Sequence, residues 1–236
     1  MPRIWEIDFF RGIAIIMMIV FHFLWDLKYF NFVSFPIYSG FWGAWQLITA
    51  SLFLFLVGIS LTLSYNRNKK DFRERFLKKG GILFAGGLLI TLVTLIAFPE
   101  IFIYFGILHF IGFSIILSIP FIERKISNLI LGVILILLPL IFALKELQII
   151  ELFWLGFATP VPTLDFFPVI PWFGVVLLGL FVGNTFYEKG ISKLKIKKPE
   201  MRIIGFVEKL GKHALIIYFL HQLILFPLVY VLSTLI

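Results

Sequence analysis

Cysteine is absent from the 236 residues of this chain, which excludes disulfides, thiolate metal sites and cysteine nucleophiles. Charged residues are scarce, at 14% of the chain against roughly 25% in an ordinary soluble domain. The sequence contains neither the G-x-S-x-G elbow of serine hydrolases nor the H-E-x-x-H pair of zinc proteases, and its dispersed histidines lack metal-ligand spacing. Thiol chemistry, those two hydrolase classes and a metal site are therefore not predicted.

The chain is instead rich in apolar residues, which make up 61% of it and include 30 Phe and 6 Trp. Runs of about 20 apolar residues can cross the hydrocarbon core of a bilayer as helices. Such runs lie near residues 9–29, 42–65, 80–98, 101–122, 127–146, 166–187 and 213–235. The shorter run IIELFWLGF is predicted to be interfacial or re-entrant. The sequence thus predicts an all-α polytopic membrane protein, with residues 1–236 forming one domain and a single bundle of about seven transmembrane helices.

Positive charge is distributed unevenly between the two sides of these predicted spans. Loops rich in Lys and Arg stay cytoplasmic, and 19 of the 21 basic residues fall on one side if the N-terminus is cytoplasmic and the C-terminus outside; Lys28 and Lys145 are the exceptions. We interpret the basic loops as topology signals and contacts with anionic lipid, not as a nucleic-acid site. The loop 187–212 is expected to carry a short amphipathic helix at the membrane surface. Its apolar residues at helical spacing are Ile203, Phe206 and Val207.

The first predicted span contains three ionisable residues in RGIAIIMMIVFHFLWD, although such groups are unfavourable in a membrane unless they face partners or water. His22 and Asp26 are four residues apart, or about 40° around a helix. Arg11 precedes His22 by eleven residues, which places it about 20° away and about 16 Å along the axis. The three side chains share one stripe, and we predict that Asp26 orients His22 as an acid/base unit. Two plainer interpretations stay open: Arg11 reaching inner-leaflet phosphates, and His22 as a hydrogen-bonded core residue.

Further polar residues are expected at the outer level of the same bundle. His109, in YFGILHFIGFS, lies about two turns into a predicted span that starts outside. Asp165 and Trp172 lie in DFFPVIPWFG, where two prolines should loosen the first turns of the sixth predicted span. His221 and Gln222 fall near the middle of the last span. Three of the four histidines are therefore predicted to be within the membrane.

These segments resemble a known family. The stretches that carry the resemblance are EIDFFRGIAIIMMIVFHFLWDL, WQLITASLFLFLVGISLTLSYNR, FGILHFIGFSI, DFFPVIPWFGVVLLGLFVG and IIYFLHQLILFPL. Together they resemble the heparan-α-glucosaminide N-acetyltransferase catalytic-domain family, within the wider transmembrane acyltransferase superfamily. The resemblance covers nearly the whole chain. In the lysosomal enzyme of that family the essential histidine lies slightly later, where this chain has KYFNFVSFPIYSG and no histidine.

The resemblance implies a membrane enzyme that takes an acetyl group from cytoplasmic acyl-CoA, a co-substrate and not a permanently bound cofactor, and delivers it to an acceptor on the far side. The acceptor is expected to be a sugar or amino sugar, carried by a glycan or glycolipid. His22 is the best match for the catalytic histidine, with Asp26 behind it and His109 as the second candidate. Arg11 would lie where the CoA end enters. The residues expected to contact the acceptor are Asp165, Trp172, His221 and Gln222.

Two other classes of function are compatible with the same residues. A proton-coupled transporter would use the intramembrane His and Asp residues as a relay, although the odd span count and the missing internal repeat disfavour it. A non-catalytic membrane protein would use them only for packing. The expected partners are acyl-CoA, a glycan or glycolipid acceptor and the lipid bilayer, and the expected location is the cell membrane. Open points are the acceptor, the acyl chain length, N- versus O-acylation, a covalent acyl-histidine intermediate and the oligomeric state, including a homodimer.

Overall fold

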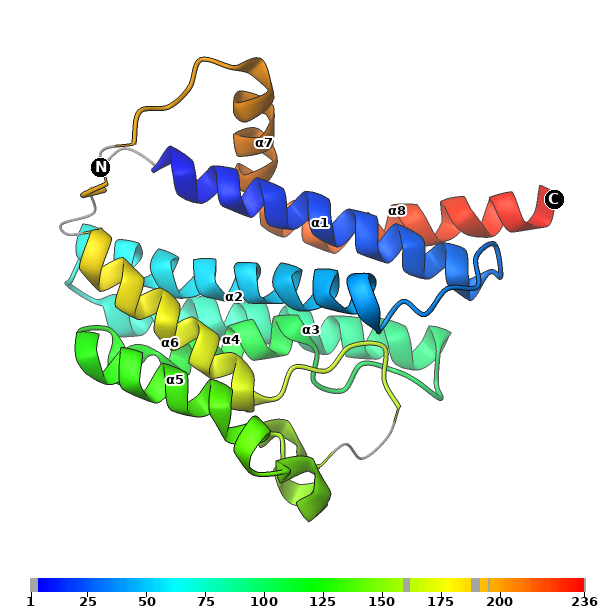
Figure 1. Cartoon of the computed structure of the whole chain (residues 1–236), viewed down its shortest axis with the longest axis horizontal. Helices are drawn as coiled ribbons and strands as arrows, with labels where there is room; N and C mark the ends of the chain where they lie inside the picture. Colours follow the sequence, from blue (N-terminus) through cyan, green and yellow to red (C-terminus); the bar gives the residue numbers. More distant parts are fainter. Residues whose placement is uncertain (1–3, 159–161, 188–191, 195, 236) are drawn as a thin grey trace. The chain divides into compact units, whose positions relative to one another are not determined.

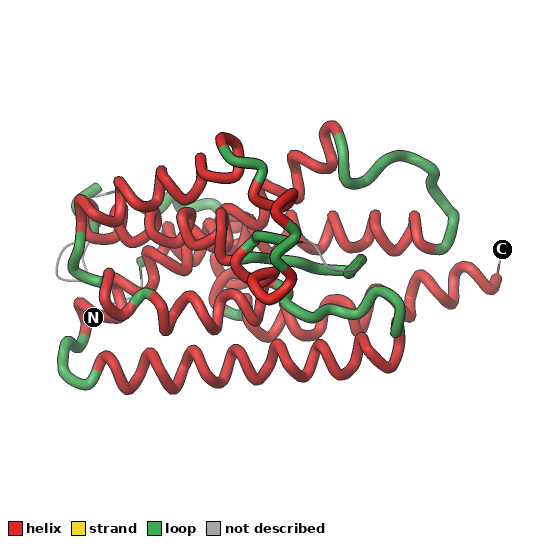
Figure 2. The backbone as a smooth tube through the Cα atoms, turned by 90° about the horizontal axis from the view of Figure 1, so that it is seen from below, coloured by secondary structure: helices red, strands yellow, loops and turns green. Residues whose placement is uncertain are grey.

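The computed structural model describes residues 4–158, 162–187, 192–194 and 196–235. Arg3, Lys189 and Lys195, which contribute to the charge asymmetry, lie outside the described residues. Within the described ranges the chain is helical, with loops between the helices and one isolated bridge between Phe105 and Phe166 (Figure 2). The predicted all-α class is confirmed.

Among the described residues, five helices are long and apolar enough to cross a membrane. They are α1 (Trp5–Tyr29), α2 (Gly40–Arg67), α3 (Phe72–Ala97), α6 (Val169–Phe186) and α8 (Ala214–Leu235) (Figure 1). This number of spanning helices confirms a polytopic membrane protein. Which side of the membrane each end faces stays a prediction, as does the single domain.

The two remaining apolar helices are shorter than predicted. They are α4 (Ile107–Leu117) and α5 (Lys125–Ile141). The predicted span 101–122 begins too early, because residues 101–106 are not helical, and His109 therefore lies in the first turn of α4 instead of two turns into a helix. The short run before the sixth span forms the 3₁₀ helix η3 (Ile150–Leu155), in agreement with the prediction that it does not span. Two smaller 3₁₀ helices complete the elements: η1 (Ile119–Phe121) and η2 (Leu144–Leu147).

The chain divides into two compact units, which are described separately. The first comprises Met1–Leu56 and Lys195–Ile236, and the second comprises Val57–Leu194. The first unit contains α1, the first part of α2, α8 and the short helix α7 (Arg202–Lys212). The second unit contains the rest of α2 and the helices from α3 to α6.

In the first unit, α1 and α8 run parallel to each other, with α8 displaced towards the C-terminal half of α1 (Figure 1). The residue numbers of the contacting rings increase in the same direction on both helices. His22 contacts His221 at 4.6 Å between ring centroids, and Phe30 contacts Phe226 at 5.1 Å. Two helices that run in the same direction begin on the same side of a membrane. The parallel packing is therefore compatible with the predicted orientation, in which both helices start at the cytoplasmic face.

The predicted amphipathic helix is confirmed as α7, which crosses the N-terminal half of α1 at very short range. A Cβ atom added to Gly12 would lie 2.0 Å from the carbonyl oxygen of Val207, and one added to Gly211 would lie 1.7 Å from that of Asp8. Small residues permit such close backbone approach between helices. Val207 is buried in this contact, whereas Ile203 and Phe206 are each 57% exposed. Val207 thus faces the protein, whereas Ile203 and Phe206 can face lipid.

In the second unit, glycines again mark the close contacts between helices. α3 and α4 pack as one antiparallel pair, with Gly80 against the backbone of Gly112, and α5 and α6 pack as another, with Gly132 against Gly174. These contacts are the small-residue interfaces that let helices pack without a hydrophobic driving force between them. The first turns of α6 are irregular at Ile170, as its two prolines predict.

The α1–α7 contact yields a test with a matched control on the same helix. Gly211→Ala should destabilise the protein by about 1–3 kcal/mol, because the new methyl group overlaps the backbone of α1. Gly205→Ala meets nothing within 4 Å and should leave stability unchanged or raise it by about 0.5–1 kcal/mol, since alanine is the better helix former. Thermal unfolding in detergent measures both. Equal effects of the two substitutions would contradict the close contact.

Candidate functional site

Four of the candidate residues meet where α1 and α8 pack together. We call His22, Asp26, His221 and Gln222 the α1–α8 cluster. His22 and Asp26 lie one turn apart on α1, and His221 and Gln222 are adjacent on α8. Asp26 is completely buried and His221 is 9% exposed. The parallel packing of two apolar helices therefore brings four polar side chains into one place.

The hydrogen bonds of the α1–α8 cluster differ from the predicted pairing of His22 with Asp26. The amide Nε2 of Gln222 donates to Oδ1 of Asp26 at 2.5 Å, a contact between residues 196 positions apart. The ring of His22 instead bonds through Nδ1 to the carbonyl oxygen of Met18, one turn earlier, at 2.9 Å. The prediction that Asp26 orients His22 directly is thus wrong in this structure, because the carboxylate is held by α8.

Both histidines of the α1–α8 cluster use the same nitrogen for a backbone contact. Nδ1 of His221 lies 2.6 Å from the carbonyl oxygen of Tyr218, as Nδ1 of His22 lies beside Met18. A carbonyl oxygen only accepts, so each Nδ1 must carry the proton, and in a neutral imidazole the proton-free nitrogen is then Nε2. The rings meet edge to face, at 86°. The cluster therefore offers two imidazoles with lone pairs on Nε2.

Three buried polar atoms of the α1–α8 cluster have no hydrogen-bond partner: Oδ2 of Asp26, Oε1 of Gln222 and Nε2 of His221. All three are acceptors when the histidine is neutral. Unpaired buried acceptors are uncommon in proteins and mark places where water, an ion or a substrate completes the bonding. The α1–α8 cluster thus has unused capacity to accept hydrogen bonds.

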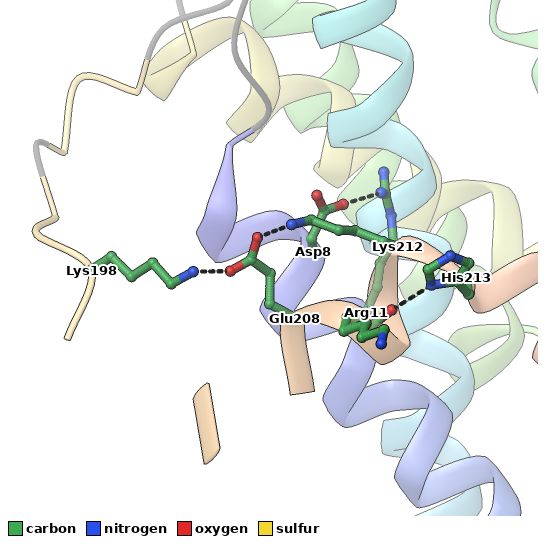
Figure 3. Close-up of polar contacts among 7 residues, drawn as sticks. Asp8, Arg11, Lys198, Glu208, Lys212 and His213 are labelled. Carbon is green, nitrogen blue, oxygen red and sulfur yellow. Dashed lines mark hydrogen bonds and ion pairs between the residues drawn. The ribbon is translucent and has the colours of Figure 1, made fainter. Parts of the chain in front are cut away.

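A second group of charged residues lies at the N-terminal end of α1, where α7 crosses it (Figure 3). Arg11 is ion-paired with Asp8 at 2.8 Å. Glu208 of α7 is bonded to both Lys198 and Lys212. Asp8 and Glu208 were not among the predicted site residues. Their sequence signals are spacings of three and four residues, from Asp8 to Arg11 and from Glu208 to Lys212, which place each pair on one helix face.

Glu208 is ionised at neutral pH. Hydrogen bonds from Lys198 and Lys212 lower the pKa of its carboxyl below the ordinary value of 4.5, and burial opposes them only in part. The side chain is 7% exposed, and its two partners lie on α7 itself and in the loop that precedes α7. The charges of this group are therefore largely compensated within the protein.

His109 belongs to the second unit, and both of its ring nitrogens are engaged there. Nδ1 accepts from the backbone N–H of Gly106 at 3.3 Å, and Nε2 lies 3.2 Å from the hydroxyl of Thr91, which itself donates to the carbonyl oxygen of Ile103. The ring is 1% exposed and fills the space beside Gly87. Nδ1 therefore caps the start of α4, and Nε2 joins α4 to α3.

Asp165 and Trp172 also lie in the second unit. Oδ2 of Asp165 accepts the backbone N–H of Ile107 at 2.8 Å and so caps the start of α4. Burial raises the pKa of Asp165 to about 7, although the bond from Ile107 favours its ionised form. Trp172 packs against Phe167, with ring centroids 4.8 Å apart. The structure gives both residues local roles, and their predicted contact with an acceptor stays a prediction.

A pair of histidines lies between apolar helices, and the described residues include five helices able to span a bilayer, which defines a polytopic membrane protein with ionisable groups at the level of its spans. The chain belongs to the heparan-alpha-glucosaminide N-acetyltransferase catalytic family, whose model matches residues 3–223 and so includes the whole α1–α8 cluster. The family resemblance found in the sequence is confirmed, and it implies a membrane-bound acetyltransferase. Comparisons with curated proteins and with solved structures find no match.

The pKa of Glu208 yields a pH-dependent prediction. Because this pKa is lower in the folded state, ionised Glu208 should stabilise the protein above pH 4.5 and lose that contribution as the pH falls through the lowered value. Thermal unfolding midpoints of the wild type and Glu208→Gln should differ at pH 7 and converge as the pH drops below 4.5. A difference that stays constant over this range would show that the ion pairs contribute nothing measurable.

The bonds of His109 predict a structural effect of its replacement. His109→Ala leaves the Gly106 N–H without its acceptor and opens a cavity beside Gly87, so we expect a loss of at least about 1–3 kcal/mol of stability. Leu89→Ala, at a 57% exposed position on α3, is the control and should change the unfolding midpoint little. If His109→Ala unfolds like the wild type, His109 is not a structural residue.

Proposed function

We propose that this protein transfers an acetyl group from cytoplasmic acetyl-CoA to a hydroxyl or amine acceptor on the far side of the membrane, with the α1–α8 cluster as its reaction centre. The observation that carries the proposal is the pair of imidazoles whose Nδ1 atoms are held by backbone carbonyls. This arrangement leaves Nε2 to accept a proton, as a general base requires. Membership of a family named for an N-acetyltransferase supports the same reaction class.

His22 is the proposed general base. Its Nε2 takes the proton from the acceptor, the acceptor oxygen or nitrogen forms a bond to the thioester carbon, and the carbon–sulfur bond of acetyl-CoA breaks. The departing thiolate then takes the proton from the imidazolium, so that His22 returns to its neutral state. The bond from Nδ1 to Met18 keeps the ring in one tautomer during this cycle.

His221 is proposed to share the reaction centre with His22. Its ring lies 4.6 Å from that of His22, and its Nε2 is buried without a partner. Nε2 of His221, a buried hydrogen-bond acceptor beside the base, can accept a hydrogen bond from the molecule that receives the acetyl group. His109, whose two ring nitrogens are already bonded, is the weaker candidate for this chemistry.

Arg11 is proposed to lie near the entrance for the CoA moiety. It is eleven residues before His22 on one continuous helix, which corresponds to about 16 Å along the axis. Its ion pair with Asp8 fixes the guanidinium in the first turns of α1, at the crossing with α7. A cation at this end of the helix is suited to phosphate groups, and the α1–α8 cluster at the other end is suited to the thioester.

The proposed function predicts a large effect of His22→Ala. Loss of a general base typically lowers the rate by about 10²–10⁴-fold, and we expect that loss in the transfer of labelled acetyl from acetyl-CoA to the membrane and glycan fraction of the host. Leu223→Ala, at a 64% exposed position on α8, is the control and should keep full activity. The labelled product identifies the acceptor.

Acetyl-CoA binding provides the accompanying measurement. The wild type should be stabilised by acetyl-CoA, by about 2.7 kcal/mol at a concentration 100 times the dissociation constant, and His22→Ala should keep most of this effect. A folded His22→Ala protein with full activity would remove His22 from the reaction. If acetyl-CoA does not stabilise the protein, and the protein drives proton-coupled uptake into liposomes without CoA, the proposed acetyltransferase function is rejected in favour of a transporter.

A further inference from the structure

The helix that carries His221 has few contacts that fix its position. Only His221 and Val229 are buried among the residues of α8, and most of its other side chains face outward. An apolar side chain gains no hydrophobic free energy when it moves from lipid to another apolar surface. The exposed apolar side chains of α8 therefore do not drive its packing in a membrane. The register and rotation of α8 must therefore come from specific contacts.

Glycine contacts fix only the start of α8, because Gly211 touches α1 three residues before Ala214 and the rest of α8 has no such contact. The α1–α7, α3–α4 and α5–α6 pairs are each locked by glycines that touch the partner's backbone, but α8 contains no glycine. Apart from one hydrogen bond, its described contacts with α1 are ring contacts, in which Phe30 meets both Phe226 and Tyr230. Aromatic side chains a turn apart can exchange partners when one helix slides along the other. These ring contacts alone permit more than one register.

The hydrogen bond from Gln222 to Asp26 is different, because it joins two particular atoms. The carboxylate is completely buried and can only accept, which fixes the orientation of the Gln222 amide. Gln222 is adjacent to His221 in the chain. A shift of α8 by one residue would turn it by about 100° and move it by about 1.5 Å, and would break this bond and the His22–His221 contact together.

We propose that Asp26 and Gln222 are positioning residues, whose hydrogen bond fixes α8 against α1 and keeps His221 beside His22. Asp26 acts on the histidine pair through Gln222 and not by bonding to His22. The effect on catalysis rests on the proposed function, whereas the effect on helix register does not. The register and the reaction can therefore be tested separately.

The absence of cysteine makes a direct test of register straightforward. Cysteines placed by Phe30→Cys and Phe226→Cys, whose rings are 5.1 Å apart, report the register through the yield of a short thiol crosslink. Adding Gln222→Leu should reduce this yield by roughly 3- to 20-fold, the range that one interhelical hydrogen bond in a membrane supports. Asp26→Asn retains an amide oxygen as acceptor and should keep the yield, and Leu223→Ala is the lipid-facing control.

Two further measurements separate positioning from general stability. The ¹⁵N spectrum of labelled histidines should show the His221 signals displaced in Gln222→Leu and unchanged in Asp26→Asn, with His221→Gln giving the assignment. Acetyl-CoA turnover should fall about 10- to 100-fold in Gln222→Leu, since a displaced group loses about that much. If Gln222→Leu fails to fold, Asp26→Leu with Gln222→Leu removes both partners without leaving a buried group unpaired and should show the same low crosslink yield.

The crosslinking yields decide whether Asp26 and Gln222 are positioning residues. Unchanged crosslinking in Gln222→Leu overturns it, whatever happens to activity, because the residue would then act directly. Loss of crosslinking in Asp26→Asn also overturns it, since the charge and not the hydrogen bond would hold α8. If Gln222→Leu reduces crosslinking but the wild type does not turn over acetyl-CoA, the register role is supported. Only the proposed function is then rejected.

Discussion

Helices in lipid gain little by covering one another's apolar surfaces, and this constraint governs how the chain is held together. The structure meets it in two ways. Glycines at Gly12, Gly80 and Gly132 let one backbone approach another closely enough for dispersion contacts to accumulate. Where glycine is missing, as along α8, a hydrogen bond from Gln222 to the buried carboxylate of Asp26 joins the helices instead. The polar residues of the spans are thus part of the packing as well as candidates for chemistry.

The three histidines within the apolar helices illustrate how environment separates structure from chemistry. One ring nitrogen of His109 is bonded at the start of α4 and the other to Thr91 of α3, so its imidazole completes the local framework of these two helices. His22 and His221 each use one nitrogen for their own helix and keep Nε2 for another partner. An identical residue type in an apolar helix therefore serves different purposes, according to how many of its atoms the fold already satisfies.

The charged residues near α7 show a different arrangement from the α1–α8 cluster. Asp8 pairs with Arg11, and Glu208 pairs with two lysines, so most of the charge is compensated within the first unit (Figure 3). The close contact between Gly211 and α1 holds this group at the first turns of the helix that carries His22. The proposed CoA entrance and the proposed reaction centre consequently lie on one rigid element, with the distance between them set by the helical rise.

The sequence alone determined the features that depend on composition and on positions along one helix. Apolar runs predict the spans, the spacing of His22 and Asp26 places them on one face, and the motifs identify the family, because each of these signals is local. The start of α4 was misplaced, since a cap from Asp165, 58 residues away from Ile107, begins that helix. The partner of Asp26 was likewise decided by tertiary structure. Helical geometry brings His22 within reach of Asp26, but only the packing of α8 supplies Gln222, and the rotation of one helix against another is not encoded in the spacing of either.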